Sequence, residues 1–66
     1  MKKVSVIIPA YNEAEAIGVT LRAIRERFFC DELIVVDDGS EDETATLAKK
    51  WADTVISHPY NLGKGA

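Results

Sequence analysis

The chain has 66 residues, a net charge of −3 and a single cysteine, Cys30. This length allows one domain at most, and one cysteine excludes an intrachain disulfide and is typical of a reducing compartment. The acidic balance, with scattered Lys and Arg, argues against a nucleic-acid-binding protein, and no apolar run approaches the roughly 18 residues of a membrane-spanning helix.

Three apolar segments predict strands. Residues 4–10 (VSVIIPA) and 33–37 (LIVVD) are rich in β-branched residues and do not alternate cleanly with polar ones. This pattern is typical of strands that are buried on both faces of a parallel sheet. Residues 54–57 (TVIS) predict a shorter third strand.

Two helices are expected between these strands, near 13–28 and 41–52. Asn12 with Glu15 and Ser40 with Glu43 have the spacing of capping boxes, in which a side chain satisfies the first free N–H groups of its own helix. An apolar stripe at helical spacing marks the buried side of the first helix: Ile17, Leu21, Ile24 and Phe28.

The resulting order is β-α-β-α-β, an α/β arrangement that predicts one half of a doubly wound, Rossmann-like parallel sheet. Because the chain stops within NLGKGA, residues 1–66 are interpreted as the N-terminal part of a larger domain. Ligands of such sheets bind at the carboxyl ends of the strands. This rule selects three segments, PAYNE, DDGS and HPYNLGKGA.

The two aspartates after the second strand are expected to point to opposite faces, because successive strand residues alternate. Val36 and Asp38 share a face, so a base lying on Val36 could be bound by Asp38. A carboxylate only accepts hydrogen bonds and would select a ring N–H, as in uracil or guanine. The alternative is that Asp37 and Asp38 merely cap the following helix.

The other two segments carry an aromatic residue, an acid and a lysine. Tyr11 suits stacking on a base, although packing as a loop aromatic is the better explanation for Tyr11 taken alone. Glu13 could bind a ribose or could be a first-turn acid. Lys64, between two glycines, suits a diphosphate. The segment is not a Walker loop, and no G-x-G-x-x-G follows the first strand.

Together, VSVIIPAYNE (4–13), ELIVVDDGSEDET (32–44) and NLGKGA (61–66) resemble, in order and spacing, the start of family 2 glycosyltransferases, which have the GT-A nucleotide-diphospho-sugar transferase fold. The dolichyl- and polyprenyl-phosphate sugar transferases are the most similar group. The resemblance implies nucleotide-binding residues as follows: Pro9, Tyr11 and Glu13 along the nucleotide, Val36 and Asp38 at the base, and Lys64 near the phosphates. Asp37 would be a scaffold residue.

The implied function is the transfer of a sugar from a UDP- or GDP-sugar to an acceptor such as a polyprenyl phosphate, a saccharide or a lipid. In this family an Asp-x-Asp motif binds Mg²⁺ or Mn²⁺, and none occurs in these residues. We therefore expect no catalytic residue, metal ligand or cofactor in this segment, a divalent metal in the parent enzyme, and no turnover by the segment alone.

Two alternatives stay open: a receiver-like phospho-acceptor module, which also carries paired acids, and a structural fragment without a ligand. The expected location is the cytoplasm or the cytoplasmic face of a membrane. The sequence predicts no nucleic-acid partner, and it leaves open membrane association through later parts of the parent and self-association through open sheet edges.

Overall fold

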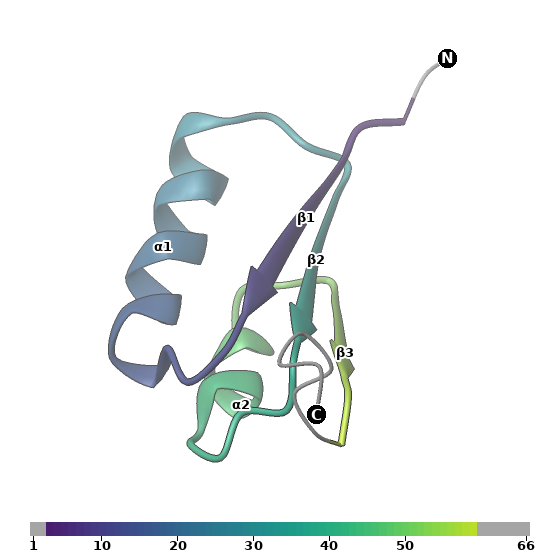
Figure 1. Ribbon diagram of the computed structural model, residues 1–66. Helices are drawn as coiled ribbons and strands as arrows, with labels where there is room; N and C mark the ends of the chain where they lie inside the picture. Colours follow the sequence, from purple (N-terminus) through teal and green to yellow (C-terminus); the bar gives the residue numbers. More distant parts are fainter. Residues whose placement is uncertain (1–2, 60–66) are drawn as a thin grey trace.

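The computed structural model describes residues 3–59. Figure 1 shows strands and helices alternating along the chain, which confirms the predicted α/β order. The elements are β1 (Ser5–Ala10), α1 (Ala14–Arg27), β2 (Glu32–Asp37), α2 (Thr44–Ala48) and β3 (Thr54–Ser57).

The three strands form one parallel sheet with β2 in the centre. Ala10 of β1 and Ser57 of β3 both pair with Asp37, the last residue of β2. All three strands therefore end at the same level, and the described residues that directly follow them lie along one edge of the sheet.

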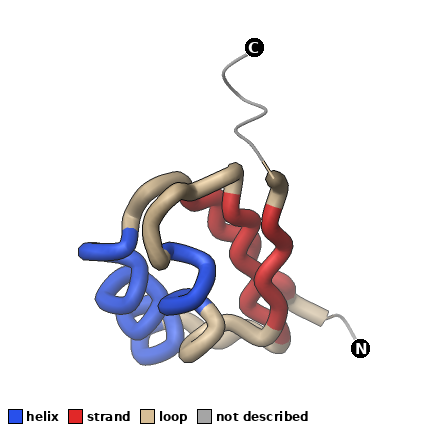
Figure 2. The backbone as a smooth tube through the Cα atoms, turned by 90° about the horizontal axis from the view of Figure 1, so that it is seen from below, coloured by secondary structure: helices blue, strands red, loops and turns tan. Residues whose placement is uncertain are grey.

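Both helices lie on the same face of the sheet (Figure 2). Two right-handed crossovers that step across the sheet in the same direction place their helices on the same side. The core between the helices and the sheet is fully or almost fully buried: Ala10, Ile17, Leu21, Leu33, Val35 and Ala48. Burial of the strands on both faces was expected, but within the described residues the other face leaves Ile7 61% and Ile56 46% exposed.

Helix α1 buries most of its predicted apolar stripe. Ile17 and Leu21 are fully buried, and Ile24 packs against the core. Phe28 was expected to continue the stripe, but it is 64% exposed. The helix ends at Arg27 and the backbone of Phe28 is extended (φ −126°, ψ 137°), so this side chain leaves the helical face.

Helix α2 is shorter than the expected 41–52. It begins at Thr44 and ends at Ala48, because residues 41–43 form a turn that bonds to the loop after β1. At the other end, the N–H groups of Lys50 and Trp51 reach back three residues, to the carbonyls of Leu47 (3.2 Å) and Ala48 (3.0 Å). Such bonds tighten a last turn and close a helix.

The expected capping boxes are wrong, because the capping groups belong to opposite loops. The N-cap residue of α1 is Glu13, whose side chain makes no capping bond. Asn12 has a left-handed backbone (φ 49°), which asparagine tolerates better than most residues. Its Oδ1 accepts a hydrogen bond from the Glu41 N–H, and its own N–H donates to Ser40 Oγ, both at 2.8 Å.

The second loop also caps the start of α1. The hydroxyl of the fully buried Thr44 accepts from the Glu13 N–H at 2.7 Å. Asp42 Oδ2 accepts from the Ala14 N–H at 3.1 Å, and Asp42 Oδ1 accepts from both the backbone and the hydroxyl of Thr44. The first turn of α1 is thus stabilised by residues about thirty positions further along the chain.

Replacing Thr44 with valine tests this cross-loop capping. Thr44→Val keeps the shape but leaves the Glu13 N–H without its acceptor, and we expect a loss of about 1–3 kcal/mol in the free energy of unfolding. Chemical denaturation followed by circular dichroism measures it. Thr46→Val, at an exposed position of the same helix, is the control and should change stability by less than about 0.5 kcal/mol. Equal losses in both variants would contradict the assignment.

The lowered pKa values of two carboxylates lead us to expect that the protein loses stability in acid. The hydrogen bond from the Thr44 side chain lowers the pKa of Asp42, and the Leu33 N–H, with Arg25, lowers the pKa of Asp53. A lowered folded-state pKa stabilises the fold above the unfolded value of about 3.9, and this contribution disappears as the pH falls through the folded value. The free energy of unfolding should therefore decline below about pH 4. The Asp53→Asn variant should be less stable than the unchanged protein at pH 7, and its free energy of unfolding should decline less steeply in acid. An equally steep decline in the variant would show that Asp53 is not a source of the acid sensitivity.

Candidate functional site

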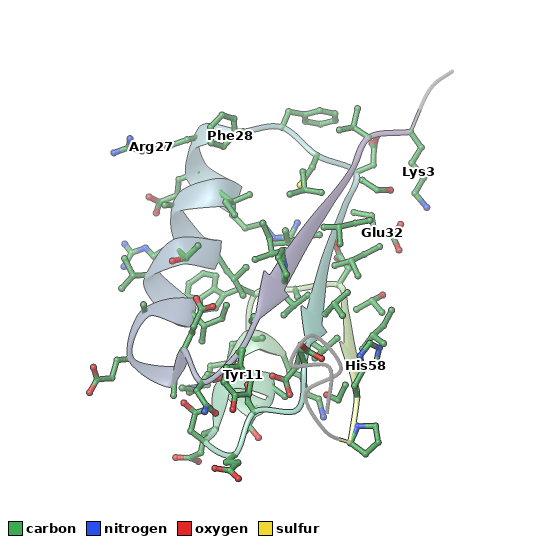
Figure 3. All side chains as sticks on the ribbon, viewed as in Figure 1. Lys3, Tyr11, Arg27, Phe28, Glu32 and His58 are labelled. Atoms are coloured by element: carbon green, nitrogen blue, oxygen red, sulfur yellow. The ribbon has the colours of Figure 1, made fainter. Side chains whose placement is uncertain are left out.

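The described residues of the three segments selected from the sequence lie at the carboxyl edge of the sheet. Figure 3 shows Tyr11 and His58 at this edge, and Arg27 and Phe28 at the opposite end of the strands. The first loop, residues 11–13, and the second loop, residues 38–43, follow β1 and β2 and bond to each other as described above. Their separation is therefore set by hydrogen bonds between them.

A hollow of about 260 Å³ opens at this edge and is lined by Pro9, Ala10, Tyr11, Glu13 and Asp38. Its volume lies just below the range of about 300–1,000 Å³ that small-molecule sites occupy. A larger hollow, about 340 Å³, is formed by residues 25–30 at the end of α1. We assign the site to the smaller one, because ligands of parallel sheets bind at the carboxyl ends of the strands.

The first loop supplies an aromatic ring and a carboxylate to the hollow. Tyr11 is 38% exposed, so part of its ring surface is accessible. Glu13 Oε1 accepts a hydrogen bond from the Tyr11 N–H at 3.3 Å. This bond turns the Glu13 side chain back over the loop, and both residues line the hollow.

The two neighbouring aspartates have different surroundings. Asp37 is 4% exposed and its Oδ1 accepts a hydrogen bond from the Ser40 hydroxyl, so it supports the second loop from inside. Asp38 is half-buried and lines the hollow. Gly39 follows with φ 76°, a backbone conformation that favours glycine. The chain turns there toward Ser40.

The sequence pattern does not single out His58, but in the structure it lies beside Asp38. Its Nδ1 is 3.6 Å from Asp38 Oδ1, and among the described residues this buried nitrogen has no hydrogen-bond partner. Its place directly after β3 is the signal that could have located it, because the residue after each strand of a parallel sheet lies near its counterparts.

The remaining predicted residues lie beside the hollow or beyond the described part. Val36 pairs with Pro9 across the sheet but does not line the hollow. It is half-buried on the face that the helices leave open. Lys64 lies outside the described residues, so the structure does not place it.

Residues 3–59 contain no group of three or more His, Cys, Asp or Glu side chains that could hold a metal ion. The two carboxylates at the hollow thus do not form a metal centre with a third ligand from this part of the chain. In the same residues, no helix has the length and apolar character needed to cross a membrane.

Comparison with known proteins identifies the family. Residues 5–66 match the family model described as glycosyl transferase family 2. The chain is 40% identical over 63 residues to the uncharacterized protein MJ1222 of Methanocaldococcus jannaschii, covering 96% of the chain and 26% of that protein. It is 35% identical over 77 residues to the dolichyl-phosphate beta-glucosyltransferase ALG5D of Trichomonas vaginalis, covering 96% and 24%.

A third relative is the 4,4'-diaponeurosporenoate glycosyltransferase of Staphylococcus aureus, which is 42% identical over 55 residues, 83% of this chain and 15% of that protein. The chain thus spans about a quarter or less of the length of these relatives. The family match favours the sugar-transferase interpretation over a receiver-like module. The chain belongs to the family 2 glycosyltransferases.

Proposed function

We propose that this chain forms the nucleotide-binding start of an enzyme that transfers a sugar from a UDP- or GDP-sugar to an acceptor. The observation that carries the proposal is the hollow at the carboxyl edge, where Tyr11, Glu13 and Asp38 meet in a member of a glycosyltransferase family. A flat aromatic face and two carboxylates suit a nucleoside, which offers a planar base, ring N–H groups and ribose hydroxyls.

The chemistry of the hollow favours the nucleoside over the diphosphate. Glu13 and Asp38 only accept hydrogen bonds when ionised, so they bind donors such as a ring N–H or a hydroxyl. The same charges repel phosphate oxygens. The diphosphate would therefore lie away from these carboxylates, and Lys64, outside the described residues, is our candidate for its contact.

Five residues in or beside the hollow have a proposed part in this binding. Tyr11 stacks on the base, Asp38 accepts from a ring N–H of the base, and Glu13 accepts from the ribose. Pro9 lies along the nucleotide, and Val36, its partner in the sheet, supports the base from the neighbouring strand.

The steps of transfer itself are proposed for the parent enzyme. When bound there, a divalent metal would neutralise the diphosphate leaving group. The described residues hold no cluster for such a metal, so we expect no sugar transfer by this chain alone.

The relatives named for dolichyl phosphate and diaponeurosporenoate support a lipid or lipid-phosphate acceptor. A cytoplasmic location stays a prediction.

Replacing Asp38 tests base recognition. Asp38→Ala removes the acceptor for the ring N–H, and hydrogen bonds to charged groups contribute enough for about a tenfold or larger loss of UDP or GDP affinity. Isothermal titration of the intact protein without metal measures it. Asp37→Asn is the matched control: it should lower the melting temperature, because Asp37 is buried against Ser40, and affect affinity less. Unchanged affinity in Asp38→Ala would refute the proposed role.

Tyr11 tests stacking separately from hydrogen bonding. Stacking of a base on an aromatic side chain contributes about 1–3 kcal/mol as measured by alanine substitution, so Tyr11→Ala should weaken nucleotide binding about fivefold or more. Tyr11→Phe keeps the ring and should bind within about twofold of the unchanged protein. The same titrations give both values. A loss in Tyr11→Phe as large as in Tyr11→Ala would show that the hydroxyl, not the ring, carries the contact.

A further inference from the structure

The pairing of β3 with β2 places His58 beside Asp38. The register pairs Asp37 with Ser57, and the His58 N–H continues the ladder by donating to the Asp37 carbonyl at 2.9 Å. His58 is therefore the residue that follows β3 as Asp38 follows β2. Backbone hydrogen bonds set the position of His58, and Figure 3 shows it at the same edge as Tyr11.

The contact between the two side chains has the features of a pair that tightens on binding. His58 Nδ1 lies 3.6 Å from Asp38 Oδ1, which is longer than the roughly 2.7–3.2 Å of an ordinary N–H···O hydrogen bond. The nitrogen is buried and finds no hydrogen-bond partner among the described residues. Buried polar groups are normally bonded, and bonds at functional sites are often long before the ligand arrives. A movement of less than about one ångström would form this one.

His58 lies beside a lining residue of the hollow and is not itself part of the lining. Asp38 lines the hollow, whereas His58 is absent from its lining residues. The pair therefore resembles a site in which one residue contacts the ligand and the next one holds it in orientation. A donor at Nδ1 exists both in the protonated imidazole and in the neutral tautomer that carries its proton there.

We propose that His58 is a positioning residue for base recognition: Nδ1–H binds Asp38 Oδ1 and fixes the carboxylate in the orientation that accepts the ring N–H of the base. This role rests on the proposed nucleotide binding. It gives the site selectivity for bases with a ring N–H, uracil or guanine, over cytosine and adenine, whose corresponding ring nitrogen is an acceptor.

The test compares nucleotides that differ in this one group. Affinities of the intact protein are measured for UDP against CDP and for GDP against ADP. We expect the unchanged protein to prefer UDP or GDP, and His58→Leu to lower that preference about fivefold to tenfold through weaker binding of the preferred nucleotide. His58→Asn places an amide N–H close to the position of Nδ1 and should restore most of the preference, which a role in packing alone would not predict.

A double-mutant cycle ties the effect to Asp38. In an Asp38→Ala background, His58→Leu should cause no further loss of preference, because the group that it orients is gone. Circular dichroism and melting temperature identify any variant that fails to fold, and His58→Asn then carries the comparison with the unchanged protein. An unchanged preference in His58→Leu, or equal weakening of all four nucleotides, would overturn the positioning role.

Failure of the proposed function looks different. If the unchanged protein binds none of the four nucleotides, or if Asp38→Ala leaves their affinities unchanged, the nucleotide site itself is refuted and the role of His58 falls with it. If Asp38→Ala abolishes the preference and His58→Leu does not, nucleotide binding stands and only the positioning role is refuted.

Discussion

The structure depends on the hydrogen bonds that join the loop after β1 to the loop after β2. The Asn12 N–H donates to Ser40 Oγ and Asn12 Oδ1 accepts from the Glu41 N–H. Thr44 and Asp42 in turn accept from the first N–H groups of α1. Free N–H groups at a helix start must be satisfied by some acceptor. Here the acceptors come from the next βα connection, so the start of α1 and the turn before α2 stabilise each other.

This interlocking defines the hollow. Tyr11 and Glu13 belong to the first loop, Asp38 to the second, and the bonds between the loops fix their separation. Asp37 supports this contact between the loops, because its carboxylate accepts a hydrogen bond from the Ser40 hydroxyl, and Ser40 Oγ in turn accepts one from the Asn12 N–H. A chain of hydrogen bonds thus runs from the end of β2 to the loop that carries Tyr11. Among the acidic residues around the second loop, Asp37 and Asp42 accept hydrogen bonds within the fold, and Asp38 lines the hollow.

The sequence predicted the parts of this arrangement that depend on local pattern. The apolar runs located all three strands, and the alternation of strand residues separated Asp37 from Asp38, as the burial of Asp37 confirms. The predicted capping partners were wrong, because suitable spacing within a segment does not exclude partners from elsewhere in the chain. The actual partners of Asn12 lie about thirty residues away. His58 was missed for the same reason, since only the register between β2 and β3 brings it to Asp38.

The one-sided covering of the sheet has a consequence for the site. The edge strands β1 and β3 leave Ile7 and Ile56 exposed on the face opposite the helices. Val36 of the central strand pairs with Pro9 on one side and with Ile56 on the other. Apolar side chains on parallel strands are normally covered. The backbone N–H groups of Tyr11, Glu13 and Asp38 all donate hydrogen bonds within this chain, so the backbone positions of these residues do not require that cover. Val36 contacts a ligand only if the open face stays accessible beside Pro9, which makes its proposed role the one that depends most on the surroundings of the sheet.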